Sequence, residues 1–185
     1  MKGWVVWLIG LPGSGKTVRA KELMKKLKAK KIKFEYLRMD EIRKFLTPEQ
    51  DYTEKEREQA YRSLILIAKF LSENGINVIL DATAHRRKWR EIARGLIPNF
   101  LEVYIKCPID ICMQREANRK DNLIASNLYK KAIERKQSGK KQKQVGDVVG
   151  IDVPFEEPRK PDLMIDSSKL DPEESAEKIL EFLKI

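Results

Sequence analysis

Short apolar runs alternate along the chain with longer segments in which apolar residues recur every three or four positions. The short runs are rich in Val, Ile, Leu and aromatic residues, as is typical of strands buried on both faces of a sheet. The predicted strands are Val5 to Ile9, Phe34 to Arg38, Val78 to Leu80, Leu101 to Ile105 and Leu163 to Ile165. The alternation predicts an α/β fold with a five-stranded parallel sheet and helices on both of its faces.

Three of the longer segments have a clear helical pattern. The first runs from Gly15 to about Lys30, and the second runs from about Glu54 to Glu73. Asn74-Gly75 should end the second helix, because glycine tolerates the left-handed conformation of a helix cap. In the third, Asp171 is suited to cap the helix and Pro172 to occupy its first position.

The segment from Glu116 to Val149 is polar, rich in Lys and poor in long apolar runs. Part of it, Leu123 to Gln137, could still form a helix. We interpret this segment as a helical lid rather than a linker, because a predicted strand and helix follow it and complete the sheet. The chain from 1 to 185 is therefore expected to be a single domain.

The residues between the first predicted strand and the first predicted helix match the phosphate-loop pattern G-x-x-x-x-G-K-[ST]. They are Gly10, Leu11, Pro12, Gly13, Ser14, Gly15, Lys16 and Thr17. Backbone N–H groups of such a loop face phosphate oxygens, and the helix that follows adds its positive N-terminal end. We expect Lys16 to reach the β- and γ-phosphates of ATP and the Thr17 hydroxyl to bind Mg²⁺. This pattern predicts the three-layer sandwich of P-loop NTPases, without separating kinases from other ATPases.

Two carboxylates follow predicted strands, at the edge where sheets of this kind carry their sites. Asp40 is expected to face the γ-phosphate and to orient or deprotonate the acceptor hydroxyl, or to hold Mg²⁺ through water. Its alternative role is that of a helix N-cap. Asp81 ends the third apolar run and is expected to support Mg²⁺. The alternative for Asp81 is a polar residue that simply ends its strand.

Several arginines are candidates for binding anionic substrates, because the guanidinium fork suits phosphate and sulfate. Arg43 and Arg57 are predicted at the acceptor, although Arg57 is equally suited to a salt bridge on the surface of its helix. Arg115, at the entrance to the predicted lid, is expected to contact the nucleotide. His85, the only histidine, is interpreted as a structural residue rather than a catalyst.

The formal net charge of +10 over 185 residues favours anionic partners, and nucleotides, RNA or DNA would all satisfy it. No stretch of the sequence has the length and apolar character of a membrane span. The two cysteines, Cys107 and Cys112, have no further Cys or clustered His with which to complete a metal site. We interpret them as buried free thiols in a reducing cytoplasm.

Several motifs resemble the adenylylsulfate kinase family, whose members transfer phosphate from ATP to the ribose 3′-hydroxyl of adenylyl sulfate. The resemblance covers nearly the whole chain. It rests on the phosphate loop, Asp40, Arg43, Leu128-Tyr129-Lys130-Lys131-Ala132 and Gly150-Ile151-Asp152-Val153-Pro154-Phe155-Glu156-Glu157-Pro158. It implies that Asp40 acts on the acceptor, that Arg43 and Arg57 bind adenylyl sulfate, and that the protein is a homodimer.

The chain departs from the family's pattern at the acceptor. The family usually has Asp-Gly-Asp-Asn before the motif Arg, whereas this chain has Arg38-Met39-Asp40-Glu41. A family Asn is replaced by Ala60, and an aromatic residue that stacks on the acceptor adenine is replaced by Val148. Ala82-Thr83-Ala84-His85 stands in place of the family's Ser-Pro. These losses concern recognition of the acceptor rather than phosphoryl transfer.

Two other functions remain open at this point. The segments Asp40-Glu41-Ile42-Arg43 and Asp81-Ala82-Thr83, with the arginines that follow, also resemble polynucleotide 5′-hydroxyl kinases and seryl-tRNA kinases. An RNA or tRNA is therefore the second class of acceptor. The third hypothesis is an ATP-binding module that catalyses little.

Overall fold

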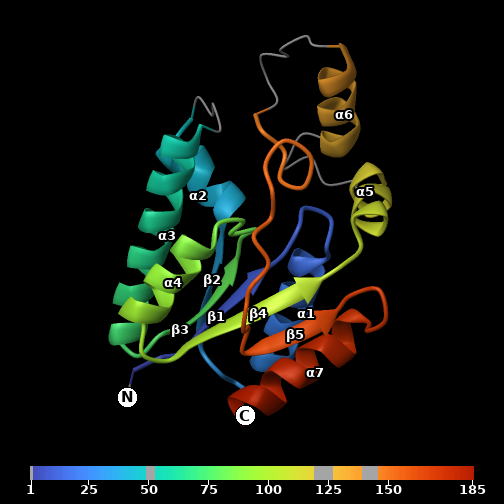
Figure 1. Cartoon of the computed structure of the whole chain (residues 1–185). Helices are drawn as coiled ribbons and strands as arrows, with labels where there is room; N and C mark the ends of the chain where they lie inside the picture. Colours follow the sequence, from blue (N-terminus) through green and yellow to red (C-terminus); the bar gives the residue numbers. More distant parts are fainter. Residues whose placement is uncertain (1, 49–52, 119–126, 139–145) are drawn as a thin grey trace.

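A parallel sheet forms the centre of the computed structural model, which describes residues 2–48, 53–118, 127–138 and 146–185 (Figure 1). The five strands lie in the order β2-β3-β1-β4-β5, and every pair of neighbours is parallel. They are β1 (Val5–Ile9), β2 (Phe34–Arg38), β3 (Asn77–Asp81), β4 (Phe100–Lys106) and β5 (Leu163–Asp166). The predicted sheet is confirmed, and each strand ends within one residue of its predicted bounds.

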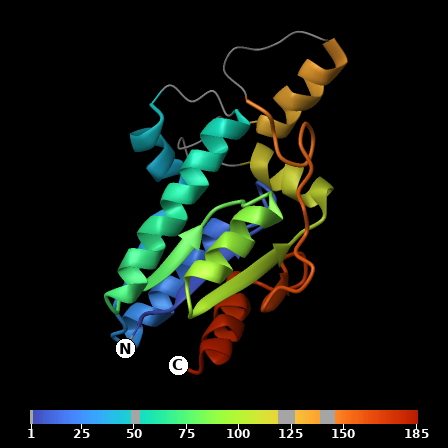
Figure 2. The same ribbon diagram turned by 60° about the vertical axis from the view of Figure 1, so that its left-hand side comes forward.

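Helices cover both faces of the sheet, as Figures 1 and 2 show. The helices α1 (Lys16–Ala29) and α7 (Pro172–Leu183) pack on one face, where Leu23 and Ile179 meet Leu8 and Ile105. The helices α3 (Glu54–Glu73) and α4 (Arg87–Leu96) pack on the other face, against alternate residues of the same strands. This is the predicted three-layer sandwich. Each helix buries its apolar stripe because strand side chains alternate between the two faces.

Three further helices lie beyond the carboxyl ends of the strands: α2 (Met39–Leu46), α5 (Ile109–Ala117) and α6 (Leu128–Ser138). No helix was predicted over α2 or α4, whose 8 and 10 residues make only about two to three turns, too few for a pattern to be recognised in the sequence. Of the helix predicted over Leu123 to Gln137, residues 128–137 are helical and residues 123–126 lie outside the described part. Closure of the segment 116–149 as a lid stays a prediction.

Strand register brings the ends of the three central strands together. Asp81 at the end of β3 lies opposite Leu8 of β1 on one side and Arg38 of β2 on the other. All five residues of β1 are fully buried, so the loop that follows β1 starts from a rigid base. The carboxyl edge of the sheet therefore collects the groups that were predicted to carry chemistry.

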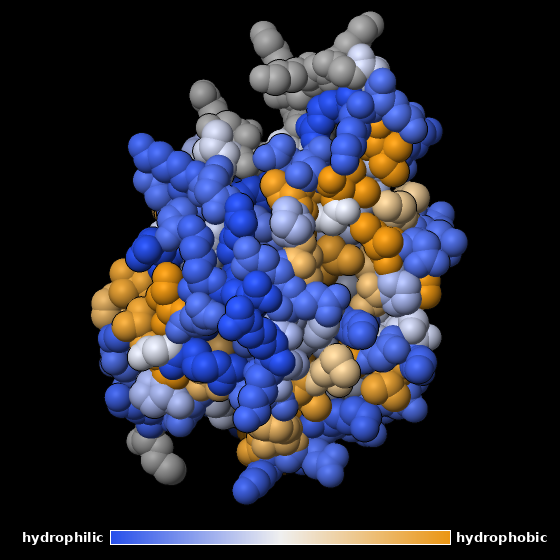
Figure 3. Space-filling view, viewed as in Figure 1, coloured by the Kyte–Doolittle hydropathy of each residue, from blue (hydrophilic) through white to orange (hydrophobic). Residues whose placement is uncertain are grey.

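Hydrophilic residues dominate the face seen in Figure 3, with an apolar patch at its left margin, where α3 lies. The outward side of α3 carries three exposed apolar side chains, Leu66, Ile67 and Phe70. Within the described residues, no helix combines the length and apolar character needed to cross a bilayer.

Candidate active site

The phosphate loop links β1 to α1 through a turn that requires glycine. Gly13 has a φ of 77°, and a Cβ built on it would lie 2.2 Å from the Cys112 carbonyl oxygen of α5. Gly15, the N-cap of α1, has a φ of 91°. Both positions lie in the left-handed region, where a side chain is strained. The loop therefore keeps its backbone against α5 and ends at the amino terminus of α1, as an anion-binding turn requires.

Lys16 lies across this loop. Its Nζ atom donates hydrogen bonds to the carbonyl oxygens of Gly10 and Leu11, each at 2.9 Å. The side chain is 8% exposed, so its charge lies close to the backbone that a phosphate would contact. From α6, the Tyr129 hydroxyl donates to the Pro12 carbonyl at 2.8 Å. The phosphate loop is thus held by its own lysine and by a residue of the predicted lid.

Asp81 joins the phosphate loop to β2. Its Oδ2 atom accepts hydrogen bonds from the Thr17 hydroxyl at 2.7 Å and the Tyr36 hydroxyl at 2.8 Å. Burial and the Asp81 carboxylate together raise the pKa of Tyr36, which keeps the phenol protonated as a donor. The two predicted metal residues, Thr17 and Asp81, are therefore in direct contact.

A hydroxyl and a carboxylate are hard oxygen donors of the kind that Mg²⁺ prefers. In the described part of the chain, no cluster of three or more His, Cys, Asp or Glu side chains could bind a metal alone. Mg²⁺ bound beside Thr17 and Asp81 would therefore take its other ligands from nucleotide phosphates and water, as this ion usually does. Thr17 and Asp81 are therefore suitable residues to hold Mg²⁺.

Asp40 lies in the first turn of α2, and Arg38 is the N-cap of that helix. The alternative role of Asp40 as an N-cap is therefore wrong, because the helix begins at Met39, two residues earlier than that role requires. The Asp40 side chain is 38% exposed, and its Oδ2 atom is 3.8 Å from Nη2 of Arg38. Its carboxylate is accessible at the carboxyl edge of the sheet, where an acceptor hydroxyl was expected.

Arg43 and Arg57 are both buried, at 5% and 7% exposure. Arg43 Nη1 donates to Glu56 Oε1 at 2.9 Å, and the Thr47 hydroxyl donates to the same oxygen at 3.0 Å. Arg57 Nη2 donates to the Asp147 carbonyl at 2.5 Å, and burial lowers the pKa of Arg57. The alternative of a surface salt bridge for Arg57 is therefore wrong. The two guanidinium groups come from α2 and α3.

Arg115 lies beside the phosphate loop. Its Nη1 and Nη2 atoms donate to the hydroxyl and the carbonyl of Ser167, at 3.1 and 2.9 Å. A Cβ built on Gly15 would lie 3.8 Å from Arg115 Nη1. This position, between the loop and the end of β5, suits contact with a nucleotide, which stays a prediction.

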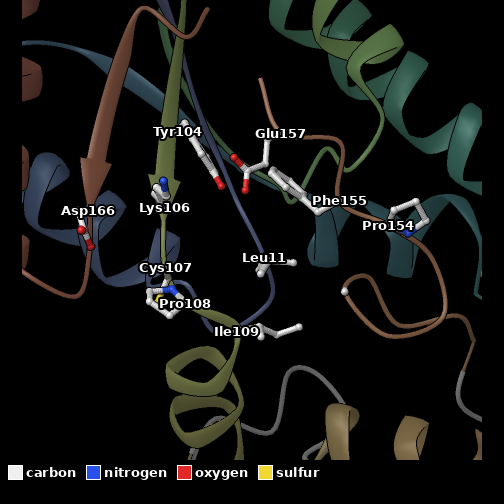
Figure 4. A pocket seen from close by; sticks show the side chains of 11 residues that line it. Leu11, Tyr104, Lys106, Cys107, Pro108, Ile109, Pro154, Phe155, Glu157 and Asp166 are labelled. Carbon is white, nitrogen blue, oxygen red and sulfur yellow. The ribbon is translucent and has the colours of Figure 1, made fainter. Parts of the chain in front are cut away.

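A cavity of about 400 Å³ opens between the end of β4, the phosphate loop and the segment 150–157 (Figure 4). The rings of Tyr104 and Phe155 stack along its wall with centroids 5.7 Å apart. Leu11 is the one predicted site residue among the residues that line it. Asp40, Arg43 and Arg57 do not line this cavity, so the predicted acceptor site is a separate region.

Ala60 and Val148 replace an Asn and an aromatic residue of the family's pattern, and both are buried. Ala60 is fully buried in the core under α3. Val148 is 5% exposed and packs with Cys107, Cys112 and Tyr129. Both side chains take part in the packing of hydrophobic clusters.

Three residues of the site escaped the sequence analysis as functional candidates. They are Tyr36, which binds Asp81, Arg38, which lies beside Asp40, and Glu56, which pairs with Arg43. Only Glu56 had a local signal, as a carboxylate one turn into a predicted helix. The contacts of the other two depend on which strands are neighbours.

The sheet order, the phosphate loop and the Thr17–Asp81 contact define a nucleotide-binding protein of the P-loop class. Comparison with known proteins narrows this class. The family model for adenylylsulphate kinase matches residues 2–166, so the chain belongs to the adenylylsulfate kinase family.

Individual relatives agree with this assignment. The adenylyl-sulfate kinase of Halothermothrix orenii is 34% identical over 183 residues, which cover 99% of this chain and 90% of that protein. The adenylyl-sulfate kinase of Rippkaea orientalis is 31% identical over 99% of this chain and 92% of its own. The structure of the Mycobacterium tuberculosis APS kinase CysC in complex with AMPPNP and APS superposes with a TM-score of 0.82 and 26% identity. That match covers 100% of this chain and 99% of that one.

Proposed function

We propose that this protein transfers the γ-phosphate of ATP to the ribose 3′-hydroxyl of adenylyl sulfate. The observation that carries the proposal is the contact between Thr17 and Asp81 at 2.7 Å. It joins the phosphate loop to the carboxyl edge of the sheet, beside the elements that hold Asp40, Arg43 and Arg57. Family membership supports the choice of adenylyl sulfate, since the relatives named above are adenylyl-sulfate kinases.

Each residue has a defined task in this reaction. Lys16 and the loop amides stabilise charge on the transferred phosphoryl group, and Thr17 and Asp81 hold Mg²⁺. When bound, the ion supplies positive charge at the phosphate oxygens. Asp40 orients the acceptor hydroxyl and accepts its proton. Arg43 and Arg57 bind the anionic part of the acceptor, and Arg115 contacts the nucleotide.

Incubation with γ-labelled ATP tests the proposal, with adenylyl sulfate in one arm and a 5′-hydroxyl RNA in the other. We expect label on adenylyl sulfate alone. Label on RNA alone would establish the second acceptor class, and ATP binding without any labelled acceptor would indicate a binding module. Lys16→Met should abolish labelling. Lys21→Met is the matched control, because Lys21 lies on the exposed side of the same helix. The expected homodimer stays a prediction.

A further inference from the structure

Arg38 is a buried cation at the end of β2, and the roles assigned above do not use it. Its side chain is 8% exposed, and the residue lies in register with Asp81 of β3. Its Nη1 atom donates to Glu41 at 3.4 Å, and its Nη2 atom is 3.8 Å from Asp40. Both carboxylates belong to partly exposed side chains, at 56% and 38%. These ion pairs are therefore long and half solvated, and stabilise the guanidinium little.

Two further donor atoms of Arg38 differ from Nη1 in their contacts. Its Nε and Nη2 atoms are buried and have no hydrogen-bond partner within the described residues. A buried charged group with unpaired N–H donors destabilises a folded protein. The Nε–H and Nη2–H pair is one edge of the guanidinium fork, the geometry that binds two oxygens of one oxyanion. A bound anion would complete this site.

The surroundings of Arg38 place that anion at the reaction centre. Asp40 follows it by two residues, and Asp81, bonded to Thr17 of the phosphate loop, is its register partner. Arg38 therefore lies at the same edge of the sheet as the phosphate loop and the predicted acceptor residue Asp40. The family's usual Asp at this position would repel an oxyanion, whereas Arg38 attracts one.

We propose that Arg38 binds a tetrahedral oxyanion during the reaction, through its Nε–H and Nη2–H groups. The anion is either the γ-phosphoryl group of ATP or the anionic group of the acceptor, and both offer the same oxygens. This inference rests on the proposed kinase function and adds an anion-binding residue to it.

Binding measurements on Arg38→Met distinguish the two sources. Calorimetry with Mg²⁺ compares ADP, AMPPNP and, in the presence of ADP, adenylyl sulfate. If the anion is the γ-phosphoryl group, AMPPNP should bind about tenfold to a hundredfold more weakly while ADP binds as before. If it belongs to the acceptor, adenylyl sulfate should lose this affinity instead. Arg62→Met, which changes an arginine with a 61% exposed side chain on α3, is the matched control and should change neither.

Thermal unfolding separates this role from a structural one. Removal of a buried, under-satisfied cation should leave the melting temperature of the ligand-free Arg38→Met protein equal to or above that of the wild type. The ligand that binds Arg38→Met more weakly should also raise the melting temperature of this variant less than it raises that of the wild type. If Arg38→Met does not fold, Arg38→Lys takes its place in these measurements. Lysine keeps the positive charge but lacks the paired N–H donors of the guanidinium group, so the same loss of affinity is expected.

The proposal is overturned if AMPPNP and the acceptor that the wild type phosphorylates both bind the Arg38 variant within about twofold of wild-type affinity. Transfer by the wild type is measured in parallel. A wild type that labels no adenylyl sulfate would contradict the proposed function, and the comparison of AMPPNP with ADP would still decide whether Arg38 binds the γ-phosphoryl group.

Discussion

The buried ion pair between Arg43 and Glu56 gives a quantitative prediction. The pair spans 2.9 Å, with side chains 5% and 7% exposed, and the Thr47 hydroxyl binds the same Glu56 oxygen. Glu56→Gln keeps the shape but removes the negative charge beside a buried guanidinium. Loss of one partner of a buried pair costs about 3–5 kcal/mol. At about 2–4 °C per kcal/mol for a chain of this size, the melting temperature should fall by about 6–20 °C.

Urea unfolding without ligands, arranged as a double-mutant cycle, tests this reasoning. Glu56→Gln, Arg43→Met and the double variant should give a coupling energy above about 1 kcal/mol, because the double variant leaves no unpaired charge. Glu54→Gln is the matched control in the same first turn of α3. Glu54 is 48% exposed and its ion pairs lie on the surface, so its loss should cost less than about 1 kcal/mol. A cost for Glu56→Gln no larger than that of this control would refute the argument.

Three further variants test single residues. Asp40→Asn should lower kcat by about a hundredfold or more while calorimetry finds ATP binding unchanged, and full activity would remove Asp40 from the mechanism. Tyr36→Phe removes one of two donors to Asp81, so the Mg²⁺ concentration that half-saturates ATP binding should rise several-fold, and an unchanged value would exclude a positioning role. Burial, and then nearby arginines, lower the pKa of His85 from 6.5 to about 3. As the pH falls below about 6.5, His85 is therefore protonated in the unfolded chain but not in the folded protein, and the free energy of unfolding should decrease. In His85→Leu, the free energy of unfolding should decrease less between pH 7 and pH 5 than it does in the wild type. The same decrease in both proteins would contradict a neutral, buried His85.

The parts of the fold that depend on local sequence patterns could be predicted from the sequence. Strands buried on both faces appear as apolar runs, so the strands were predicted within one residue. The phosphate loop was predictable because its glycines, Lys16 and Thr17 are fixed by contacts within one turn. Strand order is a non-local property. The approach of Tyr36 to Asp81, 45 residues further along the chain, follows from the pairing of β2 with β3, which no single segment encodes.

At the proposed acceptor site, charged groups are present where two of the family's contacts are absent. Val148 is enclosed under α6 and Ala60 lies in the core, so neither offers a ring or an amide to a base. By contrast, the neighbouring elements β2, α2 and α3 each contribute one buried guanidinium group, from Arg38, Arg43 and Arg57. A stacking ring selects a base, whereas paired guanidinium donors select an oxyanion. On this reasoning, we expect the anionic group of the acceptor to contribute more to its affinity than the base does.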